Sequence, residues 1–265
     1  MKFSIVLSTQ PTTFSALAYQ GKLIENVSRI KTLGFDGIEL AVRDPALIDV
    51  SSLTSLLKEH RLPVSAIGTG QAYVEERLSF IDPSKGFREK AIGRIKTQAR
   101  FAALFDAIVI IGLVRGKRES DLDPETADRW LVHGLRACAS ENPGVRFAIE
   151  PINRYETNLV NTARSGIELL EKVDKKNVGL LLDTFHMNIE EPSMTESIKL
   201  VGDLLFHFHV ADSNRWYPGA GHIDFRSVFE TLEEIGYTGY VSAEMLPLPD
   251  PDVAARKTIE YLQRF

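Results

Sequence analysis

Short apolar runs, many rich in β-branched residues, recur along the whole chain and are separated by helix-length segments of mixed polarity. In most runs the apolar residues are consecutive rather than alternating, which is typical of parallel strands covered on both faces. The pattern predicts eight strands, at Phe3–Leu7, Gly37–Val42, Pro63–Ile67, Ala107–Val114, Val145–Ile149, Val178–Leu182, Leu204–Val210 and Tyr240–Met245.

Two intervening segments carry clear helix signals. Between Asp224 and Ile235 the apolar residues recur at the 3.6-residue spacing of a helix, with Asp224 as the N-cap and Gly236 as the stop. A second helix begins at Asp123 and Pro124, because proline suits the first helical position.

Two shorter signals concern helix ends. Ser193 and Glu196 have the spacing of a capping box. The segment Leu33–Gly37, which leads into a strand, has the same pattern as Ile235–Gly239. We therefore expect two βα units to use the same helix-to-strand loop.

The alternation of strands and helices defines the fold class. Eight strands and eight helices over 265 residues correspond to about 33 residues per unit, the size of a βα repeat. No linker or charge block divides the chain, so we expect an α/β protein with one domain over residues 1–265, a single (β/α)8 TIM barrel. A doubly wound open sheet is the rival, but the segment Ser8–Thr13 lacks the glycine-rich phosphate loop expected after its first strand.

Composition narrows the class of partner. The 31 Lys and Arg residues against 36 Asp and Glu residues give a net charge of −5, which repels a nucleic-acid backbone. Cys138 is the single cysteine, the N-terminal apolar run Phe3–Leu7 is too short for a signal-peptide core, and no stretch approaches the ~20 apolar residues of a membrane span. We expect a soluble, cytoplasmic protein with neither nucleic-acid nor membrane partners.

Four ligand-type side chains end the last four predicted strands: Glu150, Asp183, His209 and Glu244. The active site of a TIM barrel lies at the carboxyl ends of its strands, so these groups should converge on one rim. Burying three carboxylates together without a cation would cost many kcal/mol or force protonation, on the order of the penalties for isolated buried charges. We therefore predict a divalent metal site, for Mn²⁺ or Mg²⁺ first and then Co²⁺ or Zn²⁺.

Each of these residues alone has a simpler interpretation. A carboxylate at a strand end is often only a helix N-cap, and His209 alone would more often be a hydrogen-bonded residue of the barrel wall. We interpret His207, one layer deeper, as a packed and hydrogen-bonded core residue, and Glu39 as a hydrogen-bond partner facing the barrel interior. Four such groups on successive strands favour the metal site.

Several sequence blocks resemble a known family. The blocks Ile149–Thr157, Leu182–Glu191 and His207–Arg215 are similar to the xylose isomerase-like superfamily, and within it to the D-tagatose 3-epimerase and ketose 3-epimerase group. The blocks Gly68–Tyr73 and Ile110–Gly116 resemble the branch that includes 5-keto-L-gluconate epimerase. The likeness extends nearly end to end.

The resemblance implies a metal at the same four positions and substrate contacts from Glu156, His186 and Arg215. It implies a small-molecule ketose or keto-sugar acid as substrate, and assembly as a homodimer or homotetramer. Its activity would be epimerisation next to a ketone, with Glu150 and Glu244 as the catalytic acid and base. These two lie three strands apart, about 135° around the ring, and so could approach a substrate from opposite sides.

Other activities stay open. An aldose–ketose isomerase, such as a hydroxypyruvate isomerase-like enzyme, would use the same ligands, and a keto-inositol dehydratase shares the chemistry of proton removal. A DNA-repair nuclease would need a basic groove and more histidines than the six present. A sugar-binding protein without catalysis would be expected to lack one of the two glutamates.

Two further segments, after the fourth and seventh predicted strands, each have two possible roles. Arg115, Lys117 and Arg118 are by default a solvated loop, and alternatively a site for the carboxylate of a sugar acid. Trp216 and Tyr217 could stack on a sugar or mark a subunit contact, and they are left unassigned.

Overall fold

A closed parallel barrel, seen in a computed structural model that describes residues 1–265, forms the centre of the molecule. The strands follow the order β2-β1-β3-β4-β5-β6-β7-β8-β9, and pairing of β1 with β9 closes the ring. The strands are β1 Lys2–Ser8, β2 Tyr19–Gln20, β3 Gly37–Ala41, β4 Val64–Gly68, β5 Ile108–Ile111, β6 Phe147–Ile149, β7 Val178–Asp183, β8 Leu205–Val210 and β9 Tyr240–Ala243.

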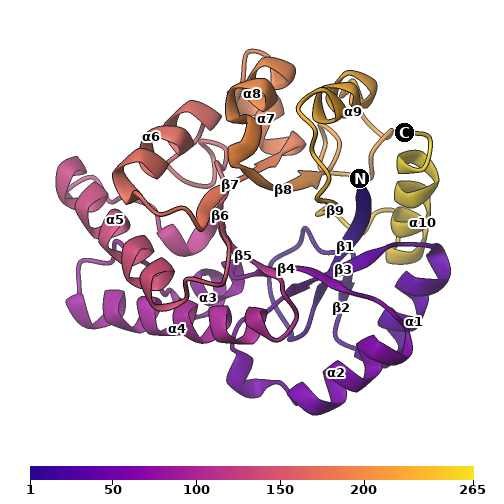
Figure 1. Ribbon diagram of the computed structural model, residues 1–265, viewed down its shortest axis with the longest axis horizontal. Helices are drawn as coiled ribbons and strands as arrows, with labels where there is room; N and C mark the ends of the chain where they lie inside the picture. Colours follow the sequence, from indigo (N-terminus) through magenta and orange to yellow (C-terminus); the bar gives the residue numbers. More distant parts are fainter.

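Helices surround the barrel as an outer layer (Figure 1). The α-helices are α1 Leu23–Leu33, α2 Val50–Glu59, α3 Gly70–Glu76, α4 Lys85–Ala103, α5 Pro124–Glu141, α6 Ala163–Val173, α7 Thr184–Glu190, α8 Met194–Val201, α9 Phe225–Glu234 and α10 Pro251–Leu262. Three short 3₁₀ helices are η1 Pro45–Leu47, η2 Leu113–Arg115 and η3 Gly202–Leu204. None of these helices combines the length and the apolar character needed to cross a membrane.

The (β/α)8 TIM barrel predicted from the sequence is confirmed: the eight predicted strands correspond to β1 and β3–β9. The apolar run Ala107–Val114 was predicted too long, because β5 ends at Ile111 and the next apolar residues turn into η2. The pattern also missed β2, whose two residues pair with Leu7 and Ser8 of β1 outside the closed ring.

Two of the three predicted helix starts, those of α5 and α9, are confirmed, and the third, that of α8, is confirmed in part. The carboxylates of Asp123 and Asp224 accept hydrogen bonds from backbone N–H groups in the first turns of α5 and α9. Ser193 likewise accepts from the backbone N–H of Glu196, at 3.3 Å. No return bond from the Glu196 side chain is found, so the predicted capping box is only half formed.

The two predicted copies of one loop are confirmed. Gly34 and Gly236 follow α1 and α9 with φ of 96° and 70°, a left-handed conformation that favours glycine. The next residue in each copy, Phe35 or Tyr237, returns its N–H to a carbonyl five positions earlier in the helix. Each loop thereby ends the helix and directs the chain into the next strand.

Alternation along each strand divides the core in two. A cluster of 62 buried apolar residues fills the space between the barrel and its helices. Inside the barrel, a small cluster joins side chains from four strands: Ala66, Ile108, Ile110, Ala148 and Leu181. A side chain therefore faces the barrel interior when it lies two residues from one of these positions.

Packing against β7 leaves no room for a side chain at Gly179. An added Cβ would lie 2.6 Å from Cγ of Phe206 and 2.7 Å from the backbone oxygen of Leu204. We expect Gly179→Ala to lower the free energy of unfolding by about 1–3 kcal/mol, the usual cost of overpacking. Equilibrium unfolding in urea measures this change.

Gly93, in the exposed interior of α4, provides the matched control, because nothing lies within 4 Å of its added Cβ. Gly93→Ala should stabilise the protein by roughly 0.5–1 kcal/mol through helix propensity. Equal unfolding midpoints for the two variants would contradict the packing argument.

Candidate active site

The strand periodicity brings the predicted ligands to one place. In β6, Ala148 faces the barrel interior and Ile149 faces the outer core, so Glu150 faces inward again just beyond the strand. The same alternation turns three further side chains inward at or just beyond the ends of β7, β8 and β9: Asp183, His209 and Glu244.

These four side chains form a compact cluster in which each offers one ligand atom, and these atoms lie within 4.8 Å of one another. Three of the groups have a buried atom without a hydrogen bond: Oε1 of Glu150, Oδ2 of Asp183 and Nδ1 of His209. Buried polar atoms are seldom left unpaired, so these atoms indicate a missing partner. Three carboxylates and one imidazole fit a divalent cation.

The carboxyl groups oppose one another's ionisation. Burial, and then the charge of Glu244, raise the pKa of Glu150 well above its usual value. Burial likewise raises the pKa of Asp183, and it raises the pKa of Glu244 to about 7 although His209 and Arg215 act in the other direction. The cluster is therefore a place where added positive charge is stabilised.

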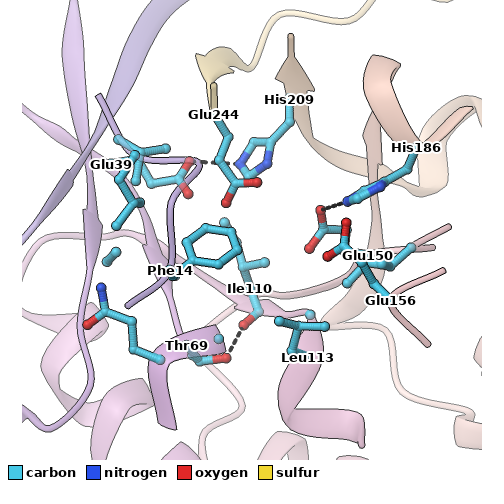
Figure 2. A pocket seen from close by; sticks show the side chains of 18 of the residues that line it. Phe14, Glu39, Thr69, Ile110, Leu113, Glu150, Glu156, His186, His209 and Glu244 are labelled. Atoms are coloured by element: carbon cyan, nitrogen blue, oxygen red, sulfur yellow. Dashed lines mark hydrogen bonds and ion pairs between the residues drawn. The ribbon is translucent and has the colours of Figure 1, made fainter. Parts of the chain in front are cut away.

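His209 is held from behind by Glu39, on β3. Nε2 of His209 lies 3.0 Å from Oε2 of Glu39 (Figure 2). Nε2 of His207 lies 2.9 Å from the same oxygen. Burial lowers the pKa of His209, but Glu39, Glu244 and Glu150 outweigh it and raise the value to about 10. Burial would raise the pKa of Glu39, but His209 and His207 hold it well below its usual range. The interpretation of His207 as a buried, hydrogen-bonded core residue is confirmed.

His186, from α7, approaches the cluster through Glu150. Its Nδ1 receives a hydrogen bond from Nδ2 of Asn153 at 2.8 Å, and its Nε2 lies 3.5 Å from Oε1 of Glu150. Asn153 is fixed in this orientation because its Oδ1 accepts from the backbone N–H of Tyr155. Burial, and then Arg215, lower the pKa of His186 well below its usual value, so a neutral ring presents Nε2–H toward Glu150.

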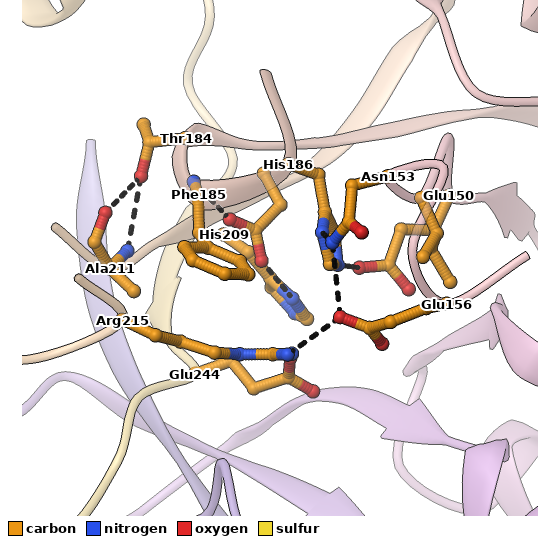
Figure 3. Close-up of polar contacts among 12 residues, drawn as sticks. Glu150, Asn153, Glu156, Thr184, Phe185, His186, His209, Ala211, Arg215 and Glu244 are labelled. Carbon is orange, nitrogen blue, oxygen red and sulfur yellow. Dashed lines mark hydrogen bonds and ion pairs between the residues drawn. The ribbon is translucent and has the colours of Figure 1, made fainter. Parts of the chain in front are cut away.

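Arg215 joins two of the predicted site residues. Its guanidinium lies 2.9 Å from Glu156 and 3.0 Å from Glu244, and it sits 4.8 Å above the ring of Phe185 (Figure 3). The backbone of Arg215 has a φ of 61°, a strained value for a residue with a side chain. Strain of this kind is common where a loop must present a functional group.

Two polar residues that the sequence reasoning missed organise these contacts. Asn153 bridges His186 and Glu156 (Figure 3). Asp212 is fully buried, and its carboxylate accepts hydrogen bonds from the backbone N–H groups of Ser213 and Gly219, which shapes the loop carrying Arg215. Both lie in the sequence blocks that carry the family resemblance, which was the one signal that could have found them.

A cavity opens beside the cluster and is lined by six of the seven predicted site residues, all except Asp183. Glu39 also lines the cavity (Figure 2). At Gly112 an added Cβ would lie 2.7 Å from Oε2 of Glu150, so glycine is needed for this carboxylate to reach its place. The apolar lining residues are Val6, Phe14, Leu17, Ala41, Ile110, Leu113 and Ile152.

Trp216 and Tyr217 do not line this cavity, and neither do the three cations after β5. The interpretation of those cations as a solvated loop is wrong for Arg115, which is fully buried. Nor does Arg115 reach the cavity to bind a substrate carboxylate, while Lys117 is exposed at a separate surface hollow.

The guanidinium of Arg115 binds the main chain instead. It donates to the backbone oxygens of Leu159 at 3.1 Å and Val160 at 3.3 Å, and also to that of Glu150. The arginine therefore ties the end of β6, from which Glu150 projects, to the loop that follows it.

The sequence was compared with known protein families. Residues 27–265 match the family described as Xylose isomerase-like TIM barrel. The chain belongs to this family. Its membership agrees with both the closed barrel and the resemblance stated from the sequence blocks.

Relatives of this xylose isomerase-like chain include named epimerases. It is 42% identical over 238 residues to a D-psicose 3-epimerase of Agrobacterium fabrum, covering 84% of this chain and 78% of the relative. It is 30% identical to a 3-dehydro-D-guloside 4-epimerase of Escherichia coli, covering 91% and 94%. A crystal structure of D-allulose 3-epimerase from Methylomonas sp. in complex with D-allulose superposes with a TM-score of 0.85 at 25% identity, covering 100% and 96%.

The buried arginine generates a prediction. Arg115→Met would remove hydrogen bonds to three backbone oxygens; that of Val160 would keep the N–H of Ile152, but those of Glu150 and Leu159 would lose their donor. We expect the free energy of unfolding to fall by about 2 kcal/mol or more. Urea unfolding measures the change. Lys117→Met, at an exposed neighbour, should alter it by no more than roughly 0.5 kcal/mol; matching losses in the two variants would exclude the proposed tie.

Proposed function

We propose that this protein is a metal-dependent keto-sugar epimerase that inverts the carbon next to a ketone. The observation that carries the proposal is the meeting of two glutamates, an aspartate and a histidine, three of which line a cavity that also carries His186, Glu156 and Arg215 and several apolar side chains. The names of its relatives, a D-psicose 3-epimerase and a 3-dehydro-D-guloside 4-epimerase, support the same reaction class.

Glu150, Asp183, His209 and Glu244 would hold the cation. Their three carboxylates and one imidazole favour Mn²⁺ or Mg²⁺, followed by Co²⁺ or Zn²⁺. When bound, the cation would polarise the ketone and stabilise the negative charge that develops on the substrate oxygens.

Glu150 and Glu244 would move the proton. Epimerisation removes a proton from a carbon beside the ketone and returns one to the opposite face, so it needs a group on each side. The two glutamates follow β6 and β9, three strands apart around the closed ring. The carboxylate of one takes the proton, the carboxyl group of the other supplies one, and the roles exchange in the reverse direction.

The remaining polar groups would hold the sugar. His186 presents Nε2–H beside Glu150, which places a hydrogen-bond donor next to one of the two acid–base groups. Arg215, fixed between Glu156 and Glu244, supplies a second donor beside Glu244, the other acid–base group. Together they would fix the substrate so that the reacting carbon lies between the two carboxylates.

For the substrate we propose a keto-sugar acid, with 5-keto-L-gluconate and D-tagaturonate as the epimer pair. The blocks that resemble the corresponding branch contribute Gly68–Gln71 and Gly112–Leu113 to the cavity wall, where they can contact a ligand. A neutral ketose is the alternative, because Arg215 is the one guanidinium on the cavity and it already binds two carboxylates.

We also propose that the whole chain is one domain and that it assembles as a homodimer or homotetramer. One large cluster of 62 buried residues, with members from Ile5 to Leu262, supports one domain. The assembly rests on the family resemblance.

The reaction is tested by incubating the metal-loaded protein in D₂O with keto-sugar acids, ketohexoses and ketopentoses. We expect deuterium at the carbon beside the ketone with inverted configuration, and a higher kcat/KM for the keto-sugar acid than for the neutral ketoses. Isotope only at C1 or C2 of an aldose–ketose pair would identify an isomerase, and loss of water a dehydratase. A preference for neutral ketoses would remove the proposed substrate and leave the epimerase.

The role of Glu244 is tested by Glu244→Gln. We expect weaker metal binding and a loss of turnover of about 10²–10⁴-fold, because both a ligand and an acid–base group are removed. Glu230→Gln, at an exposed position of α9, is the control and should keep full turnover. Full activity of Glu244→Gln, or of wild-type protein after exhaustive chelation, would refute the assignment.

A further inference from the structure

One carboxylate oxygen is shared by two histidines in the interior of the barrel. Oε2 of Glu39 lies 2.9 Å from Nε2 of His207 and 3.0 Å from Nε2 of His209. All three side chains are at most 1% exposed. The two imidazole rings meet edge to face, with centroids 5.2 Å apart.

This arrangement determines which nitrogen of His209 keeps its proton when the ring ligates a metal. An ionised carboxylate only accepts hydrogen bonds, so Nε2 of each histidine must be the donor. In the neutral imidazole that ligates a metal, the lone pair then belongs to Nδ1. Nδ1 of His209 has no hydrogen bond and lies 3.8 Å from Oδ2 of Asp183, on the side of the metal-binding cluster.

We propose that Glu39 is a positioning residue of the metal centre: it holds His209 in the tautomer and orientation that direct Nδ1 at the cation. His207 takes part as the second donor that fixes the shared oxygen. This inference rests on the proposed metal site, and it assigns a role to a residue that does not itself ligate the cation of that site.

Two irregularities in the barrel lie beside this contact. The pairing of β3 with β4 shifts so that Ser65 is skipped and Glu39 lies opposite Ala66. The pairing of β7 with β8 shifts so that Phe206 is skipped just before His207. Bulges re-aim side chains and are frequent beside functional sites, so the backbone is adjusted on both sides where Glu39 and the histidines meet.

The same three residues could be interpreted as a second cation site, since their ligand atoms also lie within 4.8 Å of one another. That use would take Nε2 of His209 as a ligand while Nδ1 ligates the first cation, and the ring would then have to lose both of its protons. Two hydrogen bonds of ordinary length need no such change. The geometry therefore favours positioning over a second cation.

The experiment is a calorimetric titration of metal-stripped protein with Mn²⁺. We expect one ion per wild-type chain and a Kd raised about 10–100-fold in Glu39→Gln, the usual effect of losing a carboxylate behind a ligating histidine. His207→Phe, which keeps Glu39 but removes one donor, should raise the Kd less. Ser65→Ala removes a buried hydroxyl on the adjacent strand and should leave the Kd within about twofold.

A second measurement reads the tautomer directly. In Mg²⁺-loaded protein labelled with ¹⁵N-histidine, nuclear magnetic resonance should show His209 protonated at Nε2. In Glu39→Gln this resonance should broaden or be joined by a second form. A purely structural role of Glu39 would lower the unfolding temperature without changing either the Kd or the tautomer.

The outcomes separate this inference from the proposed function. Wild-type protein that binds no Mn²⁺ would overturn the metal centre together with this role. Tight wild-type binding that Glu39→Gln leaves within about twofold would overturn the role of Glu39 alone. Two ions per chain, with one lost in Glu39→Gln, would show instead that Glu39 and the histidines form a second cation site.

Discussion

Mutual repulsion among three buried carboxylates is the constraint around which this site is organised. Their charges lie at the rim of a barrel whose walls exclude water, so each needs a positive or hydrogen-bonding neighbour. Arg215, on the cavity, forms an ion pair with Glu244, and Arg115 donates a hydrogen bond to the backbone oxygen of Glu150. Asp183 is stabilised at one oxygen by the first turn of α7. The atoms that remain unpaired all face the centre of the cluster, where a cation fits.

The fold and the convergence of the ligands follow from simple periodicity. Consecutive apolar runs require strands covered on both sides, and closing eight of them brings their ends together. The two-residue repeat then turns Glu150, Asp183, His209 and Glu244 to the same side. The pattern failed after β5, where Leu113 and Val114 continue the apolar run but form a 3₁₀ turn instead of extending the strand.

The supporting contacts could not be derived from the pattern. Asn153 reaches His186 only because its loop folds back over the end of β6, and Arg115 is buried only because that loop covers it. From its charge, Arg115 was interpreted as a surface residue. The sequence does not show which backbone carbonyl groups of a loop are available to bind a buried guanidinium. Glu39 was expected to form a hydrogen bond with a neighbour. Its actual partners are two histidines that lie 168 and 170 residues away in the chain and share one of its oxygens. Only closure of the barrel brings them together.

That separation along the chain also bears on how the protein is made. A ribosome releases Glu39 long before His207 and His209, so during synthesis this acid has no imidazole to meet. Contacts so remote in sequence form slowly, because a large loop must close first. We therefore expect the proposed metal site to form late in folding, when the newest strands join the oldest.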